Sequence, residues 1–369
     1  MAILDRLTRP RRLLRLALAA ATFGLATSGA HAEGPDYSGS GTATFLPFLN
    51  APMAGNPVTR TPKLAIAFPG GRAHRGTMDT GSTGVVVSAT SIPNIDQLPH
   101  LGPGTLTYSS SGRIERGDWV VTPLTLSGAN GASVTTRPMP VLAVREIACA
   151  RTARNCRPRQ NPRNIAMIGI GFARQHDHQA KGTPDHNPLL MVEGMGEPGK
   201  PGAIRRGYVV SRRGVQVGLN AASATGFTFV KLEKSPVYPD WSATPVCLSV
   251  AGKTPPACGT MLMDTGVTTM YLRVPEDQLA GNTSPGNGTV PVLNPGTSVG
   301  VSIPGAAGIG YSFKMGDAAN PVAPFNVVLV RKDANSGPFV NTSVRFLNGF
   351  DYLYDADGGY VGFRPVAGQ

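Results

Sequence analysis

One four-residue sequence occurs twice in this chain and limits its fold more than any other feature. Met78-Asp79-Thr80-Gly81 recurs as Met263-Asp264-Thr265-Gly266, 185 residues further along. A motif repeated at such a distance indicates a chain built from two copies of one structural unit. The sequence therefore predicts two similar lobes, each carrying one Asp-Thr-Gly turn.

The surroundings of the two motifs also match. Residues 64–68 are typical of a short strand, and the turn at 69–71 returns the chain to Asp79. Residues 246–250 and the turn at 251–252 lead to Asp264 in the same way. An apolar element containing glycine follows each aspartate, at 167–172 and at 346–350. These matches predict an N-terminal lobe of residues 33–222 and a C-terminal lobe of residues 223–369.

Composition favours strands over helices. The chain of 369 residues contains 46 Gly and 33 Pro, and stretches with helical periodicity are scarce. Many short strands joined by turns are therefore expected. With 41% hydrophobic residues the chain can also bury a sizeable core. The predicted fold class is all-β.

Residues 1–32 are predicted to be a secretory signal. Five arginines, the last of them Arg15, precede an apolar stretch at 16–25 and the small-residue sequence Ala30-His31-Ala32. This order is typical of a signal peptide cleaved here before Glu33. Export to a periplasm or out of the cell is expected, with an uncleaved membrane anchor as the alternative. No other segment approaches a membrane span in length, so no stable membrane insertion is expected after cleavage.

The charge of the chain is basic. Its net charge is +12, and removal of the signal lowers it to +8, since 29 basic and 21 acidic residues remain. The basic residues are dispersed and are not interleaved with aromatic side chains, which argues against a nucleic-acid partner. A solvated basic surface that favours anionic cell surfaces explains the charge better.

Four cysteines in an exported chain predict two disulfides. Proximity in the sequence pairs Cys149 with Cys156 and Cys247 with Cys258. Neither pair has histidines at the spacing of a zinc site, so structural bridges are favoured over metal binding. The second bridge would hold the hairpin that leads to Asp264.

The chemistry follows from the paired motif, because a single Asp-Thr-Gly is most often an ordinary turn. Two such turns facing each other would bring the carboxyls of Asp79 and Asp264 together. Two like charges about 3 Å apart cannot both ionise cheaply, so one proton is shared and the pair titrates as a unit. One carboxyl then serves as a base and the other as an acid.

This pair predicts hydrolysis of amide bonds. The ionised carboxyl can deprotonate a water, while the protonated carboxyl hydrogen-bonds the developing oxyanion. The reaction needs neither a covalent intermediate nor a cofactor. Because one carboxyl must keep its proton, activity is expected to peak in acid.

With these residues the chain resembles the pepsin-like aspartic proteases, as a bacterial-type exported member, from about Tyr37 to Ala367. The resemblance rests on the turns at 78–82 and 263–267, the hydrophobic-Gly element at 167–172, the closing segments 351–355 and 362–367, and the cysteine pair before Asp264. It implies a bilobal, all-β double barrel with the active-site cleft between the lobes. It also implies an endopeptidase that acts as a monomer on an extended polypeptide.

The resemblance assigns roles around each carboxyl. Ser82 would hydrogen-bond the outer oxygen of Asp79, and the two threonines would form a network across the lobes. Val267 stands where a hydroxyl would support Asp264, which predicts fewer partners for that carboxyl and a larger share of the proton. The implied site comprises catalytic Asp79 and Asp264 with supporting Thr80, Gly81, Ser82, Thr265 and Gly266.

The flap of this family is a hairpin with a tyrosine near its tip, and residues 106–112 resemble it. Tyr108 is the predicted flap residue, with Ser109 where a glycine is common. Such a flap closes over a peptide and excludes water, although an ordinary exposed loop is the alternative. Val86 replaces the tryptophan that commonly orients the tyrosine, and Asn348 places a polar residue in a normally apolar pair.

The sequence offers three alternatives to a peptidase with two aspartates. His176, His178 and His186 lie near Asp177 and Asp185, but their Gly-, Pro-, Lys- and Gln-rich surroundings and lack of helical spacing argue against a metal site. No Gly-x-Ser-x-Gly elbow supports a serine hydrolase. The serious alternative is a catalytically weak or inactive protein of the same fold that binds peptides or inhibits another enzyme.

Overall fold

The computed structural model describes residues 34–39, 41–151, 153, 156–175, 177, 179, 181–286, 290–330 and 336–366. The predicted signal sequence lies outside the described residues. Short strands joined by turns dominate these ranges, and their helices are one or two turns long. No helix in the described part of the chain is long and apolar enough to cross a membrane.

The described residues form three sheets, of which the N-terminal sheet carries Asp79 at the end of a strand. All of its strands come from the first half of the chain. Its strands in spatial order are β5 (His100–Tyr108), β6 (Arg113–Thr122), β9 (Met139–Cys149), β4 (Thr83–Ser88), β11 (Ala166–Ile170), β3 (His74–Asp79), β2 (Lys63–Ala67), β7 (Thr125–Ser127) and β8 (Ser133–Thr135), with β10 (Arg159–Gln160) paired to β9.

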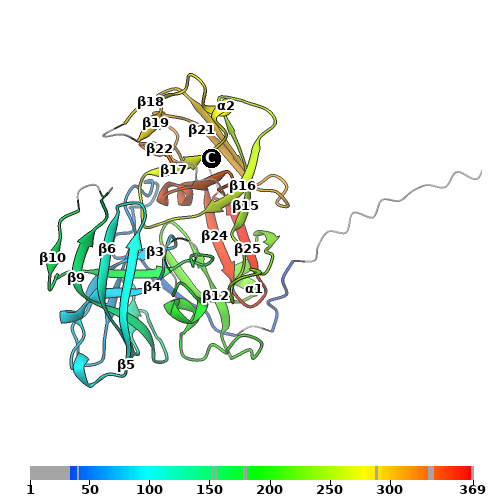
Figure 1. Cartoon of the computed structure of the whole chain (residues 1–369). Helices are drawn as coiled ribbons and strands as arrows, with labels where there is room; N and C mark the ends of the chain where they lie inside the picture. The colour runs from blue at the N-terminus through cyan, green and yellow to red at the C-terminus, as the bar shows by residue number, and fades with distance from the viewer. Residues whose placement is uncertain are drawn as a thin grey trace, which may run out of the picture. The chain divides into compact units, whose positions relative to one another are not determined.

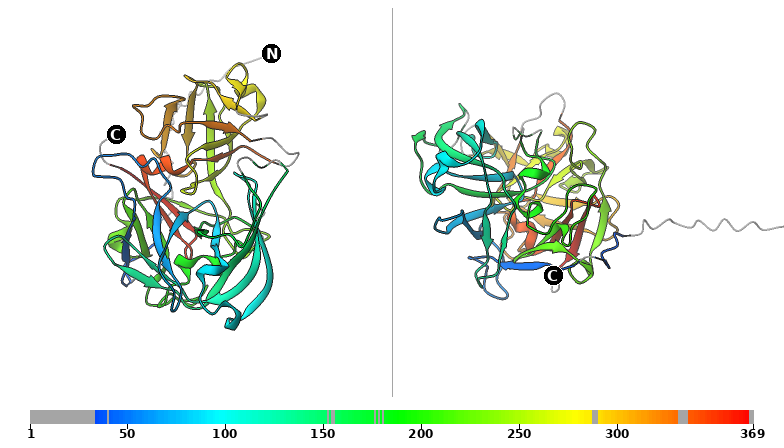
Figure 2. Two further views of the ribbon diagram at one scale, coloured as in Figure 1. Left: turned by 90° about the vertical axis from the view of Figure 1, so that its left-hand side faces the viewer. Right: turned by 90° about the horizontal axis from the view of Figure 1, so that it is seen from below.

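The C-terminal sheet is built from the second half of the chain, and one of its strands leads to Asp264. Figure 1 shows it in yellow to orange, and both views in Figure 2 show it grouped apart from the cyan strands of the N-terminal sheet. Its strands in spatial order are β18 (Thr283–Pro285), β19 (Pro291–Leu293), β22 (Val327–Leu329), β17 (Met270–Arg273), β23 (Phe339–Asn341), β16 (Ala257–Leu262), β15 (Thr244–Val250), β20 (Ser298–Ser302) and β21 (Gly310–Lys314).

The central sheet joins the two halves of the chain. Its middle pair is β12 with β24, where Tyr208 lies opposite Tyr354. Figure 1 shows β24 and β25 in red beside the green β12. Both tyrosines are fully buried, so the junction is part of the core. The strands in spatial order are β1 (Thr44–Pro47), β13 (Gly214–Leu219), β12 (Arg205–Val210), β24 (Phe350–Asp355), β25 (Tyr360–Pro365) and β14 (Thr228–Lys231).

The helices of the described residues are short connectors. A capping box starts α1, because the side chain of Asn220 accepts from the N–H of Ser223 and the Ser223 hydroxyl accepts from the N–H of Asn220. The predicted domain boundary at 222/223 falls inside this helix. The helices are α1 (Ala221–Ala224), α2 (Glu276–Leu279) and the 3₁₀ helices η1 (Ala89–Ser91), η2 (Ile95–Gln97), η3 (Pro184–His186), η4 (Pro188–Leu190) and η5 (Val344–Asn348).

Burial follows the period of two expected for strands. In β2 the buried side chains are Leu64 and Ile66, with half-buried residues between them. By contrast, β4 is buried along its whole length. Its Val85 and Val87 join the main core, whereas Val86 faces a second apolar cluster around Trp119. The strand after Asp79 is thus held on both faces.

One strand threads between the two strands that flank each Asp-Thr-Gly turn. In the N-terminal sheet β11 runs parallel to β3 and antiparallel to β4, which fits the predicted element at 167–172. In the C-terminal sheet the corresponding strand is β23, parallel to β16 and antiparallel to β17. The prediction of this second element at 346–350 is therefore wrong.

The apolar element predicted at 346–350 has a different structural role. Residues 344–348 form η5, and residue 350 begins β24. The buried side chain of Asn348 donates to the carbonyls of Val58 and Pro321 and accepts from the N–H of Val58. Asn348 therefore ties η5 to the N-terminal half and does not belong to an apolar pair inside the second turn.

Both predicted disulfides are present. Cys149 at the end of β9 is bonded to Cys156, and Cys247 in β15 is bonded to Cys258 in β16. Cys247 and Cys258 lie opposite each other in the register of the hairpin that leads to Asp264. The second bridge thus fixes the approach to that turn.

Candidate active site

The first Asp-Thr-Gly turn follows β3 and surrounds Asp79 with donors. The N–H of Gly81 donates to Asp79 Oδ1 at 2.7 Å, and Ser82 Oγ donates to Asp79 Oδ2 at 2.5 Å. Asp79 and Ser82 are both buried. Each oxygen of this carboxyl therefore has a partner from its own turn, in the arrangement that the resemblance implies for Ser82.

The second turn supports its carboxyl in a different way. Asp264 lies two residues beyond the end of β16, and the N–H of Gly266 donates to its Oδ1 at 2.7 Å. Its Oδ2 accepts a hydrogen bond of 2.5 Å from Nδ2 of Asn341, at the end of β23. The expectation that Val267 leaves Asp264 with fewer partners is therefore wrong, because Asn341 supplies the donor.

Sequence reasoning missed Asn341. It is 77 residues from Asp264 along the chain and belongs to no motif. It reaches the carboxyl because β23 pairs with both β16 and β17. The position would have been found only by placing the threading strand correctly.

The threonines of the two motifs hold the turns to each other. The N–H of Thr80 donates to Thr265 Oγ1 at 3.1 Å, and the N–H of Thr265 donates to Thr80 Oγ1 at 2.9 Å. Each hydroxyl also donates to a carbonyl of the opposite turn, Thr80 to Met263 at 2.6 Å and Thr265 to Met78 at 2.9 Å. We call these bonds the threonine network.

Each carboxyl packs against the glycine of the opposite turn. A Cβ added to Gly81 would lie 2.3 Å from Cγ of Asp264, and one added to Gly266 would lie 2.3 Å from Oδ1 of Asp79. No side chain fits in either place. The identity of these glycines is therefore a condition for the close approach of the two carboxyls.

Burial and charge act together on Asp264. Removal from water is the larger cause, and the neighbouring Asp79 carboxyl the next, of a pKa well above the usual range of an aspartate. The bonds from Asn341 and Gly266 oppose this rise because they favour the ionised form. The pair thus contains a carboxyl that keeps a proton at pH values where an exposed aspartate is ionised.

The hairpin β5–β6 contains the residues predicted to form a flap. Its turn comprises residues 109–112, and Tyr108 lies at the end of β5, opposite Arg113. The Tyr108 hydroxyl is buried and has no hydrogen-bond partner among the described residues. Burial chiefly, and then the carboxyls of Glu115 and Asp79, raise the pKa of Tyr108.

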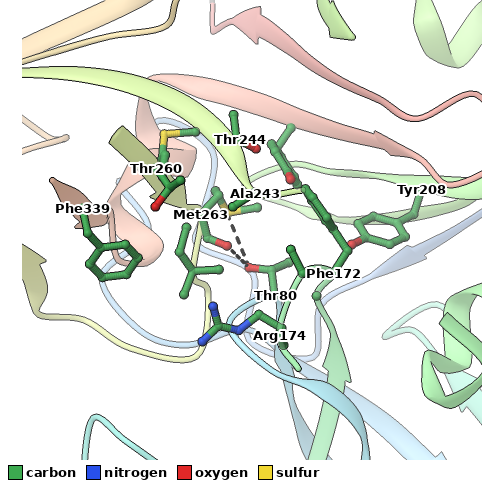
Figure 3. A pocket seen from close by; sticks show the side chains of 14 residues that line it. Thr80, Phe172, Arg174, Tyr208, Ala243, Thr244, Thr260, Met263 and Phe339 are labelled. Carbon is green, nitrogen blue, oxygen red and sulfur yellow. Dashed lines mark hydrogen bonds between the residues drawn. The ribbon is translucent and has the colours of Figure 1, made fainter. Parts of the chain in front are cut away.

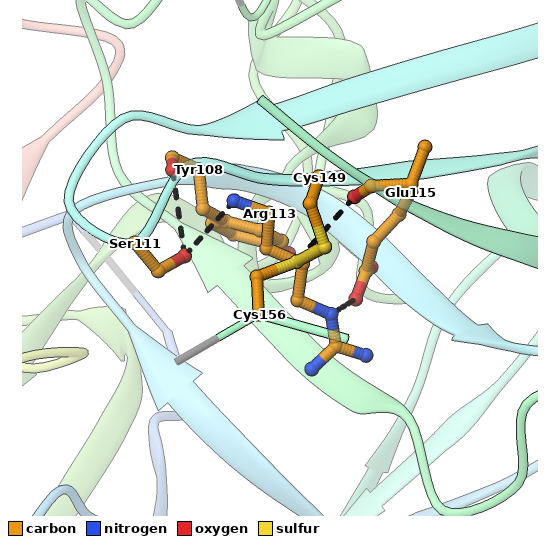
Figure 4. Close-up of a disulfide and its surroundings, with 7 residues drawn as sticks. Tyr108, Ser111, Arg113, Glu115, Cys149 and Cys156 are labelled. Carbon is orange, nitrogen blue, oxygen red and sulfur yellow. Dashed lines mark hydrogen bonds and ion pairs between the residues drawn. A yellow bond between two sulfur atoms is a disulfide. The ribbon is translucent and has the colours of Figure 1, made fainter. Parts of the chain in front are cut away.

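An ion pair between a half-buried arginine and a buried glutamate lies beside this tyrosine (Figure 4). Glu115, in β6, is 1% exposed, and its Oε1 lies 2.7 Å from Nε of Arg113. Burial raises the pKa of Glu115 to about 7, although Arg113 opposes the rise. Figure 4 also shows the Cys149–Cys156 bridge beside these residues, near the turn of the hairpin, since Cys149 lies opposite Arg113.

The apolar cluster that contains Val86 also contains an aromatic residue. Val86 belongs to the second apolar cluster together with Leu106 and Trp119, and Tyr108 packs against this cluster. Trp119 comes from the flap strand β6 itself. A tryptophan thus belongs to the apolar cluster against which Tyr108 packs, although it comes from another strand than the resemblance implies.

The tip of the hairpin contacts both halves of the chain. Ser109 Oγ donates to Asp177 Oδ2 at 3.2 Å, and the Tyr271 hydroxyl in β17 donates to the carbonyl of Ser110 at 3.4 Å. Asp177 also accepts a hydrogen bond from the guanidinium of Arg174. These contacts hold the hairpin tip between the two lobes.

A narrow cavity borders the threonine network (Figure 3). Thr80 lines it from the first turn and Met263 from the second, and Figure 3 marks the hydrogen bond between them. Arg174 lines it as well, is buried, and has no partner for its Nε among the described residues. A buried cation thus connects this cavity, through Asp177, to the flap.

The structure describes one of the three histidines considered for a metal site, His186. Within the described ranges, no group of three or more His, Cys, Asp or Glu is arranged to hold a metal ion. His176 and His178 lie outside the described residues. His186 is buried, and its Nδ1 lies 3.1 Å from Thr183 Oγ1 and 3.4 Å from Asp185 Oδ1, so it has a structural setting.

Comparison with known proteins identifies the fold. No family model matches the sequence, and no curated protein matches it. Among solved structures, the aspartic proteinase from Irpex lacteus superposes with a TM-score of 0.56 at 13% sequence identity. The match covers 88% of this chain and 98% of that one. The expectation of an all-β, bilobal pepsin-like fold is thereby confirmed.

Proposed function

We propose that this protein is an exported aspartic endopeptidase of the pepsin-like family. One observation carries the proposal: the carboxyls of Asp79 and Asp264 are buried, and each packs against the glycine of the opposite turn. Such a pair has little purpose in a protein that only binds peptides, because holding two carboxyls together out of water is costly.

In the proposed reaction the two carboxyls share one proton. Asp264 carries it, because burial and the nearby Asp79 raise its pKa. Asp79 accepts a proton from a water that attacks the peptide carbonyl, while Asp264 hydrogen-bonds the forming oxyanion. The tetrahedral intermediate then collapses, the C–N bond breaks, and the leaving amine takes a proton from the pair.

The proposed substrate is an extended polypeptide held under the β5–β6 hairpin. Tyr108 and Ser109 would contact it, since Tyr108 is influenced by Asp79 and Ser109 is at the tip. Two disulfides fit an oxidising compartment and so support export to a periplasm or to the medium.

Peptide cleavage between about pH 3 and about pH 7 tests the proposal. Asp79→Asn and Asp264→Asn should each lower kcat/KM by at least about 10³-fold without unfolding the protein. Activity should fall as pH rises through the upper pKa of the pair, because the shared proton is then lost. A statine-type transition-state inhibitor should block peptide cleavage by the wild type.

Asp277→Asn is the matched control, since Asp277 is exposed on α2 and remote in sequence from both turns. It should cleave at the wild-type rate. Peptide binding without turnover that depends on both aspartates would favour the alternative, an inactive peptide-binding or inhibitor protein of this fold.

A further inference from the structure

The two carboxyls of the proposed dyad are supported by different chemical groups. Asp79 Oδ2 has a hydroxyl donor, Ser82 Oγ, three residues further along its own turn. The equivalent residue after Asp264 is Val267, which has no donor on its side chain. The donor on Asp264 Oδ2 is the amide of Asn341, from another strand.

The orientation of the Asn341 amide is settled by its second contact. Asn341 Oδ1 accepts a hydrogen bond of 3.1 Å from the backbone N–H of Ser343. Only the amide oxygen can accept from an N–H, so the NH₂ group must face Asp264. Asn341 is buried, which keeps water from competing for either contact.

An amide in this orientation differs from a hydroxyl in one decisive property. A hydroxyl can donate to an ionised carboxyl or accept from a protonated one, whereas an NH₂ group can only donate. Asp264 Oδ2 must therefore remain an acceptor while the bond to Asn341 exists. This bond is therefore strongest when Asp264 is ionised.

We propose that Asn341 is the positioning residue of Asp264, and that it replaces the hydroxyl missing at Val267. The catalytic meaning of this assignment rests on the proposed function. The effect of the Asn341 bond on the titration of Asp264 does not rest on that function, because the bond favours the ionised carboxyl whether or not a peptide is cleaved.

The test is the titration of Asp264 in full-length protein labelled with ¹³C at the aspartate carboxyls. The Asp264 signal is assigned by its disappearance in Asp264→Asn. Asn341→Val should move the Asp264 midpoint upward, because the ionised form loses a donor. Adding Val267→Thr to this variant should move the midpoint back toward the wild-type value, because a hydroxyl returns to the same carboxyl.

Peptide cleavage gives an independent readout. Asn341→Val should lower kcat/KM about tenfold and shift the alkaline limb of its pH profile upward, and Val267→Thr should restore both in part. Should Asn341→Val fail to fold, Asn341→Ser removes the same bond with a smaller polar side chain.

An unchanged Asp264 midpoint in Asn341→Val, or a midpoint that Val267→Thr does not move back, overturns the proposal. The titration uses no substrate. Absence of peptidase activity in the wild type would therefore contradict the proposed function and leave the role of Asn341 to be judged by the midpoint alone.

Discussion

At the scale of single residues, the glycines of the two turns are as restrictive as the aspartates. Each gives room to the carboxyl of the other turn, so Gly81 serves Asp264 and Gly266 serves Asp79. A methyl group at either position would occupy the space of a carboxyl. The reason for Gly in this motif is therefore a close approach between lobes.

Gly266→Ala tests this reading. The added Cβ would meet Asp79 Oδ1 at 2.3 Å, so the turn must shift and the carboxyls separate. We expect peptide cleavage to fall by at least about 10²-fold, as misplacement of a catalytic group does. Gly337→Ala is the control, because a Cβ there meets nothing within 4 Å. Equal activity in the two variants would contradict the argument.

Glu115 should make stability depend on pH. Its pKa is raised by burial from 4.5 to about 7, so the native state binds this proton more tightly than the unfolded state. The contribution of Glu115 to the free energy of unfolding is then largest in acid and falls, by up to about 3 kcal/mol, as pH rises from about 4.5 to about 7.

Urea unfolding across that pH range measures the effect. Glu115→Gln has no carboxyl to ionise at this position. As pH rises toward neutral, the wild type should therefore lose more unfolding free energy than the variant. Parallel pH dependences in the two proteins would show that Glu115 titrates normally.

The residues found from the sequence lie in the repeated turns, where their partners are either in the same turn or in its second copy. Asp79 and Ser82 are three residues apart, and their contact is encoded by the turn. The support of Asp264 depends instead on a strand 77 residues away. Contacts of this kind follow from the pairing of strands, which the periodicity of a short strand does not specify.

At the scale of elements, β23 shows why the second half was harder to predict than the first. β11 can be recognised in the sequence by a glycine within an apolar run. β23 is only three residues long and ends in Asn341, so it has no such pattern. The apolar run at 346–350 imitates the pattern but forms η5 and the start of β24. A local pattern was outweighed by the tertiary contacts of Asn348.

The hairpin β5–β6 and its neighbouring bridge form a second unit at this scale. Replacing Cys149 and Cys156 with serine opens a loop with a sequence separation of 7. That should cost about 2 kcal/mol of stability. Because Cys149 lies opposite Arg113, the first residue of β6 after the hairpin turn, KM for a peptide should rise more than kcat falls.

Serine at Cys247 and Cys258 is the matched comparison. Its sequence separation is 11, so the stability cost should be similar, about 3 kcal/mol. It lies on the β15–β16 hairpin and should leave peptide KM near the wild-type value. If both pairs changed KM equally, the bridge beside the flap would have no special role in binding.

At the scale of the whole molecule, the threonine network joins the lobes through two mutually dependent hydroxyls. Thr80→Val and Thr265→Val should each cost about 1 to 3 kcal/mol, since each leaves buried groups without partners. The double variant should cost less than the sum, because both changes remove the same bonds.

Chemical denaturation of the four proteins in this cycle measures the coupling. Thr136→Val supplies the comparison, because the Thr136 hydroxyl accepts from Leu124 within the N-terminal sheet. Combined with Thr265→Val it should be additive. If the stability losses of Thr80→Val and Thr265→Val were also additive, the two threonines would not be coupled, and other contacts would hold the lobes together.

The central sheet has a consequence for how a polymer reaches the carboxyls. Because β12 and β24 pair within one continuous sheet, the halves share a floor that cannot be parted without breaking buried hydrogen bonds. The hairpin tip is held by two long contacts, of 3.2 Å at Ser109 and 3.4 Å at Ser110. A polypeptide is therefore expected to enter and leave the site when the tip of the hairpin opens, while the sheets that carry the two turns stay in place.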